Sequence, residues 1–271
     1  MSVRRLLVSL NGARGAADGA AVPMSPEDVV ESALGAVAAG AGEVLVHPRT
    51  PCGRESLSAR VVGPVLEALR GAGCGVPVCV AASIAAEPDP AERLARVRSW
   101  TVLPDRAEVR FAEPGARELA EALLARGVAV DAMVPLGGEA GQEPLARFLA
   151  WPVRSHAPVR GRVPEGARAR VRLAVELAAA DPGLVRGMQW LPPVAVLLYG
   201  RGEAAWPVLR MAARYGRDAR TGVGDVLHLP DGRPARSNAE LVAAALAETA
   251  AATAAPAPSP APGSGPRGAS R

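Results

Sequence analysis

The stretch Val44-Leu45-Val46-His47-Pro48-Arg49, followed by the turn Thr50-Pro51-Cys52-Gly53-Arg54, decides how this 271-residue chain is interpreted. An apolar run typical of a buried strand ends on a histidine and an arginine, and a turn rich in proline and glycine follows. In proteins that alternate strands and helices, polar side chains at the carboxyl end of a strand point into the ligand-binding mouth. The stretch therefore predicts an α/β scaffold with polar groups at its functional end.

Strand and helix patterns alternate on both sides of this stretch. We expect strands at 3–10, 43–47, 76–81, 107–111, 128–132, 152–155, 193–198 and 218–223. We expect helices at 25–39, 57–70, 89–99, 115–126, 137–149, 165–179, 203–215 and 237–251. Eight strands and eight helices in alternation predict a (β/α)8 TIM barrel. An open doubly wound sheet is the alternative, because periodicity alone does not show closure.

The domain organisation follows from a change in composition near residue 252. Residues 1–251 are predicted to form a single barrel domain, and the Ala/Pro/Ser/Gly-rich residues 252–271 are predicted to be a disordered tail. The chain is 49% hydrophobic but only 3% aromatic, so its core must consist mainly of alanine, valine and leucine. No apolar stretch reaches the roughly 18 residues that span a bilayer, and we expect the first ten residues to be a strand with charged flanks and not a signal peptide. Three cysteines without a CxxC pair indicate a reduced, cytoplasmic protein.

Arginine supplies every cationic side chain of the chain. The sequence has no lysine, so all 31 basic residues are arginines. This excludes Schiff-base aldolases, pyridoxal-phosphate enzymes and P-loop nucleotide hydrolases, since each needs a lysine amine. The net charge is only +4 and the arginines alternate with acidic residues, so nucleic-acid binding is not expected.

Polar side chains follow most of the predicted strands, where a barrel would carry its chemistry. Each of them also has a structural interpretation, as an ion pair or a helix cap. The candidates are Asn11, Arg14, His47, Arg49, Ser83, Glu113, Asp131, Tyr199, Arg201, Arg220 and Asp225. Together they would form a pocket for a small anionic ligand.

Several short motifs resemble, in their order and spacing, those of the β-keto acid cleavage enzymes, also called 3-keto-5-aminohexanoate cleavage proteins. The resemblance extends from about residue 3 to residue 247. It is carried by residues 11–13 (NGA), 22–27 (VPMSPE), 38–42 (AAGAG), 47–49 (HPR), 53–57 (GRESL), 100–105 (WTVLPD), 205–209 (AWPVL), 229–232 (LPDG) and 238–242 (NAELV).

The resemblance implies an oligomeric, zinc-dependent TIM barrel that converts a β-keto acid and acetyl-CoA into acetoacetate and a new acyl-CoA. The family holds its zinc with an H-x-H pair after the second strand and a glutamate after the eighth. Here only the second histidine persists, as His47, whereas the other two ligand positions fall on Leu45 and Gly224. Catalytic zinc normally needs three protein ligands. We therefore expect no bound zinc or other cofactor, with acetyl-CoA or CoA retained as a candidate co-substrate.

Other positions of the family site persist. Arg220 and Asp225 match the arginine and aspartate of the strand-eight motif and are the candidate catalytic residues. The candidate binding residues for a keto-acid or acyl-CoA-like ligand are Arg49, Arg14, Asn11 and Arg201. The leading interpretation is a family member with lost or strongly weakened zinc-dependent catalysis and a retained anion pocket.

Three alternatives remain open at this point. The chain could be a non-catalytic subunit that assembles with itself or with an active paralogue. It could perform metal-free chemistry with Asp225, or with Asp131, as the base. It could also rebuild a metal site around His47 from Cys52, His228 and Asp225.

Overall fold

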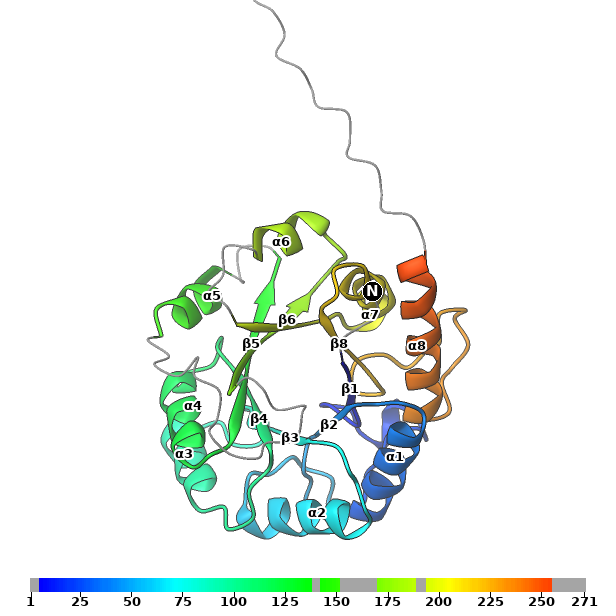
Figure 1. The fold of residues 1–271 in the computed structure, drawn as a ribbon. Helices are drawn as coiled ribbons and strands as arrows, with labels where there is room; N and C mark the ends of the chain where they lie inside the picture. Colours follow the sequence, from blue (N-terminus) through cyan, green and yellow to red (C-terminus); the bar gives the residue numbers. More distant parts are fainter. Residues whose placement is uncertain (1–4, 138–141, 152–169, 189–193, 255–271) are drawn as a thin grey trace, which may run out of the picture.

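The strands of this protein close into a barrel. The computed structural model describes residues 5–137, 142–151, 170–188 and 194–254. Eight parallel strands pair in chain order, and the sheet closes because β1 (Leu6–Ser9) pairs with β8 (Asp218–Thr221). Figure 1 looks into the ring of strands and shows the helices around it. The predicted TIM barrel is confirmed, and the open sheet is wrong.

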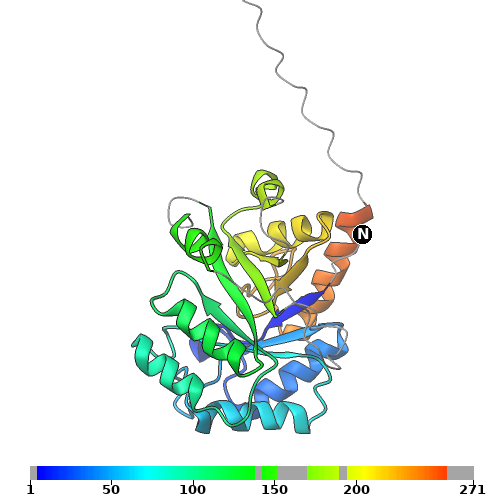
Figure 2. The same ribbon diagram turned by 60° about the vertical axis from the view of Figure 1, so that its left-hand side comes forward.

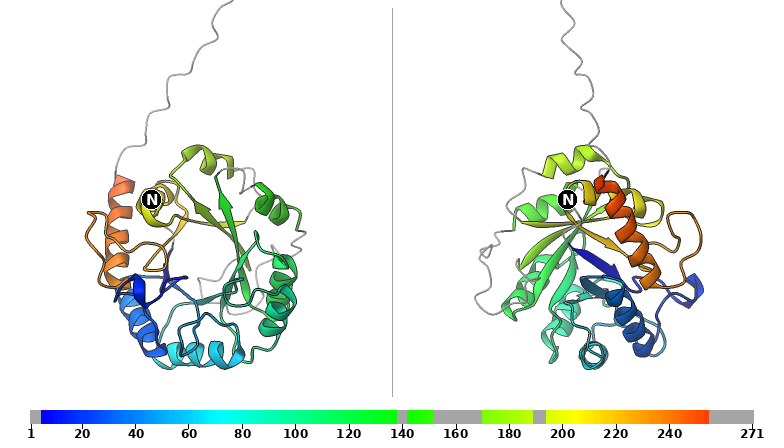
Figure 3. Two further views of the ribbon diagram at one scale, coloured as in Figure 1. Left: turned by 180° about the vertical axis from the view of Figure 1, so that it is seen from behind. Right: turned by 45° about the vertical axis from the view of Figure 1, so that its right-hand side comes forward.

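The remaining strands are β2 (Glu43–Val46), β3 (Val78–Ala81), β4 (Arg106–Arg110), β5 (Ala129–Leu136), β6 (Val171–Leu177) and β7 (Ala195–Tyr199). The helices are α1 (Pro26–Ala38), α2 (Ala59–Gly71), α3 (Pro90–Arg98), α4 (Ala116–Ala125), α5 (Gln142–Leu149), α6 (Pro182–Gly187), α7 (Ala205–Arg214) and α8 (Asn238–Ala254). They lie outside the strands when the molecule is turned (Figure 2). Helix α8 packs beside α1, so the last helix meets the first (Figure 3).

The sixth strand-helix unit differs from the sequence-based prediction. The helix expected at 165–179 is wrong, because Val171–Leu177 is strand β6, paired with β5 and β7. Arginine, alanine, leucine and glutamate favour helices, but the segment alternates with period two, and Arg172, Ala174 and Glu176 share one face of the strand. Helix α6 was not expected. The strand expected at 152–155 lies outside the described residues, as do residues 255–271 of the expected tail. The tail was predicted to begin at residue 252, but residues 252–254 still belong to helix α8.

Alternating side chains divide each strand between an outer and an inner core. In β2, Val44 and Val46 pack outward against the helices, whereas Leu45 belongs to a separate cluster inside the barrel. Glu43 and His47 lie two residues to either side of Leu45 and therefore also face inward. The interior thus has three levels along β2: a charged floor, an apolar middle and a polar mouth. No helix in the described parts of the chain is long and apolar enough to cross a membrane.

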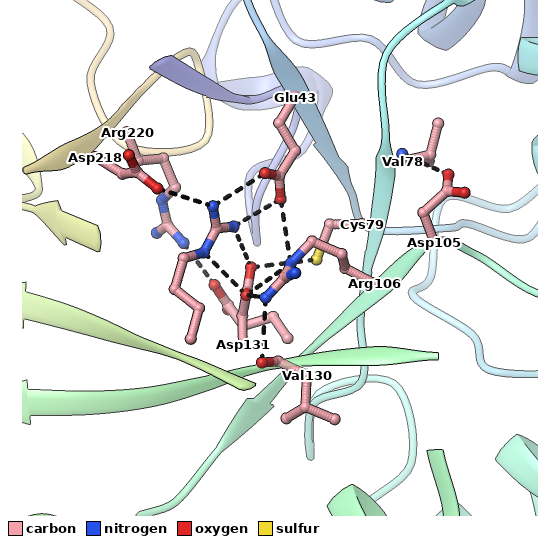
Figure 4. Close-up of polar contacts among 11 residues, drawn as sticks. Glu43, Val78, Cys79, Asp105, Arg106, Val130, Asp131, Asp218 and Arg220 are labelled. Atoms are coloured by element: carbon pink, nitrogen blue, oxygen red, sulfur yellow. Dashed lines mark hydrogen bonds and ion pairs between the residues drawn. The ribbon is translucent and has the colours of Figure 1, made fainter. Parts of the chain in front are cut away.

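Ion pairs fill the floor of the barrel, at the amino ends of the strands (Figure 4). Arg172 donates to two carboxylates of the floor, Glu43 and Asp131, and Arg106 also donates to Asp131. Asp131 was expected at the carboxyl end of its strand, but β5 continues to Leu136 and leaves it at the floor. Burial alone would raise the pKa of Asp131, but the two guanidinium groups lower it to about 2. Asp131 is therefore a structural anion.

Candidate functional site

The mouth of the barrel, at the carboxyl ends of the strands, is lined by ionisable side chains. Strand register shows that β4 contributes two of them. Glu108 pairs with Ala81, and Arg110 pairs with Met133. Both partners belong to the inner cluster, and paired residues of parallel strands share a face, so Glu108 and Arg110 point into the barrel. The other mouth residues are His47, Glu55, Ser83, Glu176, Tyr199, Arg201, Arg220 and Asp225.

The two candidate catalytic residues, Arg220 and Asp225, form a buried bidentate ion pair. The Arg220 Nε and Nη2 groups donate to the two oxygens of Asp225, at 2.9 and 2.8 Å. Nη1 donates to Glu108 Oε2 at 2.6 Å, and the guanidinium carbon lies 3.4 Å from the centre of the Tyr199 ring. Burial alone would lower the pKa of Arg220, but Asp225, Tyr199 and Glu108 raise it well above its ordinary value. Arg220 is thus a fixed cation between two carboxylates.

The imidazole of His47 has a carboxylate partner that sequence reasoning missed. His47 Nδ1 lies 3.1 Å from Glu55 Oε2, and Ser83 Oγ donates to the same oxygen at 3.5 Å. Burial alone would raise the pKa of Glu55, but the hydrogen bond with His47 and the charges of His47, Arg49 and Arg110 lower it. Glu55 is therefore a carboxylate that orients the imidazole.

The signal for Glu55 was present in the turn that follows β2. Thr50 and Arg54 hydrogen-bond across the turn at 2.8 Å, and Gly53 has a φ of 81°, a left-handed conformation that glycine adopts readily. The chain consequently folds back, and Glu55 pairs with Arg49 in an isolated antiparallel bridge. A tight turn at 50–54 therefore returns residue 55 to the level of His47.

Three of the candidate binding residues make contacts within the protein framework. Arg49 donates to the carbonyl oxygens of Gly53, Gly12 and Arg14, each at 2.7 Å. Asn11 accepts from the backbone N–H of His47 and donates to its carbonyl oxygen, both at 3.0 Å. Arg14 lies 3.6 Å from Asp18 on a surface turn. These contacts hold the loops after β1 and β2 together.

Arg201, the fourth candidate binding residue, stands at the rim after β7. Its Nε lies 3.3 Å from Glu176 Oε2 and 4.0 Å from Asp225 Oδ1. Glu176 also accepts from the hydroxyl group of Tyr199, at 2.8 Å. Arg201 is about one-third exposed, so it borders the solvent side of the mouth.

Glu113 lies nearby, in the loop after β4. It accepts from the backbone N–H of Ile84 at 2.9 Å and lies 3.6 Å from Arg93. Burial raises the pKa of Glu113 above its ordinary value. The carboxylate thus fastens the loop after β3 to the loop after β4.

Comparison with known proteins assigns this barrel to a protein family. The family model of the beta-keto acid cleavage enzymes (BKACE) matches residues 6–125 and 158–261. The chain belongs to the BKACE family. No curated protein matches it in sequence.

Solved structures agree with the fold of this family member. The complex of ObcA with a C4-CoA adduct and oxalate gives a TM-score of 0.58 at 14% identity, over 85% of this chain and 64% of that one. The complex of ObcA with oxaloacetate gives 0.54 at 14% identity, over 82% and 62%. A phospho-2-dehydro-3-deoxyheptonate aldolase from Thermotoga maritima gives 0.56 at 14% identity, over 91% and 68%. This chain therefore spans less than two thirds of the ObcA chains, and the likeness concerns the fold alone.

The mouth of this BKACE member does not fit the zinc that the family implies. Leu45, at the first histidine position, is buried in the apolar middle of the barrel. A Cβ atom on Gly224, at the glutamate position, would lie 2.8 Å from the Gly12 backbone nitrogen and 3.0 Å from its Cα, and closer still to Ser9 Oγ. Gly224 therefore has no room for a ligating side chain, and His47 lacks both family co-ligands.

The residues considered for a rebuilt metal site do not form a donor cluster with His47. Cys52 and His228 are exposed, and Asp225 is held by Arg220. Within the described ranges, the one cluster of three donors close enough for a metal is Glu43, Cys79 and Asp131, at the floor. Arg172 and Arg106 already neutralise those carboxylates, so a cation would have to displace two guanidinium groups.

Proposed function

We propose that this BKACE family member binds a small β-keto acid at the barrel mouth without zinc. Its zinc-dependent exchange of carbon–carbon bonds is lost or strongly weakened. The packing of Gly224 against Gly12 and Ser9 carries this proposal, because it removes the space for the third metal ligand. Leu45 also supports the proposal, because a buried aliphatic side chain stands where the family has a histidine.

The class of ligand is supported by the family and by the charges of the mouth. ObcA, which shares the barrel fold, was solved with oxaloacetate, with oxalate and with a C4-CoA adduct. Guanidinium groups suit such ligands because their planar fork donates two parallel hydrogen bonds to a carboxylate. Acetyl-CoA remains the candidate co-substrate, and its binding would indicate that part of the family reaction survives.

A metal analysis combined with calorimetry tests the proposal. We expect purified protein, equilibrated with zinc and then desalted, to hold far less than one zinc per chain by mass spectrometry. Acetoacetate should bind equally well before and after treatment with EDTA. His47→Gln is the matched control: its metal content should equal that of the wild type, since His47 binds no zinc. One zinc per chain, together with turnover of a β-keto acid and acetyl-CoA, would overturn the proposal.

The assembly and location of the protein stay predictions. We expect a cytoplasmic oligomer, formed with further copies of itself or with a paralogue that carries the intact H-x-H pair. Light scattering of the purified chain, alone and mixed with such a paralogue, distinguishes the two assemblies. A monomer under both conditions would refute the expectation.

A further inference from the structure

We propose that Arg110 binds the carboxylate group of the ligand, an inference that rests on the proposed function. Arg110 is the last residue of β4, and its register with Met133 turns it into the barrel. It is partly exposed there. It belongs to none of the motifs that identified the family.

Arg110 differs from the other arginines of the mouth because its donors are uncommitted. It makes no hydrogen bond and no ion pair within 4.0 Å to any residue that the structure describes. By contrast, Arg220 commits three donor groups to carboxylates and Arg49 commits its two terminal nitrogens to carbonyl oxygens. The Nε atom of Arg201 also has no hydrogen bond to a described residue, but it forms an ion pair with Glu176 at 3.3 Å. The fork of Arg110 is therefore available to a ligand.

Carboxylates surround Arg110 without contacting it. Its charge acts on three nearby carboxylates, none of which it contacts directly. Each of the three also lies beside another basic side chain: Glu55 beside His47, Glu113 beside Arg93, and Glu108 beside Arg220, which it shares with Asp225. One guanidinium group without a partner in the described part of the chain, set among several carboxylates, favours a ligand with a single negative charge. A second charge would meet the surrounding carboxylates and be repelled.

The ligand class that follows is a monocarboxylate with an uncharged remainder, such as a keto group. A bidentate guanidinium–carboxylate pair is directional, so it would also fix the orientation of the ligand.

Calorimetry with four proteins and three ligands tests this inference. The proteins are the wild type, Arg110→Met, Arg110→Lys and the control Arg117→Met, whose side chain is exposed on α4 and pairs with Glu121. The ligands are acetoacetate, its uncharged methyl ester, and oxaloacetate. We expect the wild type and Arg117→Met to prefer acetoacetate to both other ligands. Arg110→Met should weaken acetoacetate binding about 10- to 100-fold, with Arg110→Lys in between, because lysine keeps the charge without the fork.

The outcomes separate this inference from the proposed function. If the wild type binds acetoacetate and Arg110→Met binds it equally well, the role of Arg110 is refuted and the proposed function stands. If the wild type binds none of the acids, both are refuted. Equal binding of the ester and the acid by the wild type would also refute the role of Arg110, and this comparison needs no variant to fold. Tighter binding of oxaloacetate would refute the single-charge argument.

Discussion

Gly224→Ala tests the steric argument directly, because it adds one carbon atom where the family has a metal ligand. Gly224 is not among the glycines with positive φ, so alanine is compatible with the backbone and the cost is steric. The new Cβ would lie 2.8 Å from Gly12 N and 3.0 Å from Gly12 Cα, and still closer to Ser9 Oγ. Overpacking typically costs about 1–3 kcal/mol. We expect about 3 kcal/mol, because the Gly12 atoms are backbone and cannot rotate away.

The assay is urea and thermal unfolding followed by circular dichroism. In a domain of this size about 3 kcal/mol corresponds to a fall in Tm of about 6–12 °C. Combining Gly224→Ala with Ser9→Ala should recover part of the loss but not all of it, since the Gly12 backbone remains. The control is Gly71→Ala at the end of α2, where a Cβ meets nothing within 4 Å and stability should stay the same or rise slightly. Wild-type stability in Gly224→Ala would refute the steric case against a zinc ligand at this position.

The floor and the cysteines give three further expectations. Arg172→Met leaves Glu43 and Asp131 with fewer partners and should cost about 3–5 kcal/mol in urea unfolding; an unchanged midpoint would contradict the role of the ion pairs. Folding lowers the pKa of Asp131 from 3.8 to about 2. Its stabilisation, on the order of 2 kcal/mol, is therefore complete above about pH 4 and lost as the pH falls to 2; a flat profile between urea titrations at pH 5 and pH 2.5 would disagree. A thiol reagent should label the exposed Cys52 first, because hydrogen bonds from Thr50 and Arg54 lower its pKa to about 7. The buried Cys79 should react only after denaturation, because burial raises its pKa. Equal labelling rates would count against both assignments.

Much of the fold could be predicted because local signals and tertiary packing agree. Helix α1 is an example: Ser25 and Asp28 form a capping box, Pro26 occupies the first turn, and the structure starts the helix at Pro26. The apolar run before His47 likewise becomes β2, since a strand covered on both faces needs no polar face.

The sixth unit could not be predicted because its polar residues serve the inside of the barrel. Arg172 and Glu176 lie on a buried strand, where a charge is tolerated only with a partner on another strand. Arg172 finds Glu43, which is 129 positions away in the sequence. No local pattern contains that partner, and helix-favouring residue types therefore gave the wrong assignment. For the same reason, the sequence did not reveal that Asp131 lies at the floor of the barrel whereas Asp225 lies at the mouth.

The site was predicted by position more successfully than by role. Arg220 and Asp225 do come together, but the sequence did not show that Glu108 also binds Arg220, which leaves that arginine little freedom to bind a ligand. The contact of Glu55 with His47 could be predicted only by knowing that the turn at 50–54 folds the chain back. Arg110 required strand register, because only its pairing with Met133 shows which way it points.

The buried carboxylates and the imidazole of the mouth have partners within the protein. Among the described residues, the buried side-chain atoms without hydrogen-bond partners are arginine Nε atoms, and none belongs to a carboxylate or to an imidazole. His47 has Glu55, and the space beside Gly224 is filled by Ser9 and Gly12. Because these groups are already bound within the protein, the guanidinium group of Arg110, which has no such partner among the described residues, is the group best placed to bind a ligand.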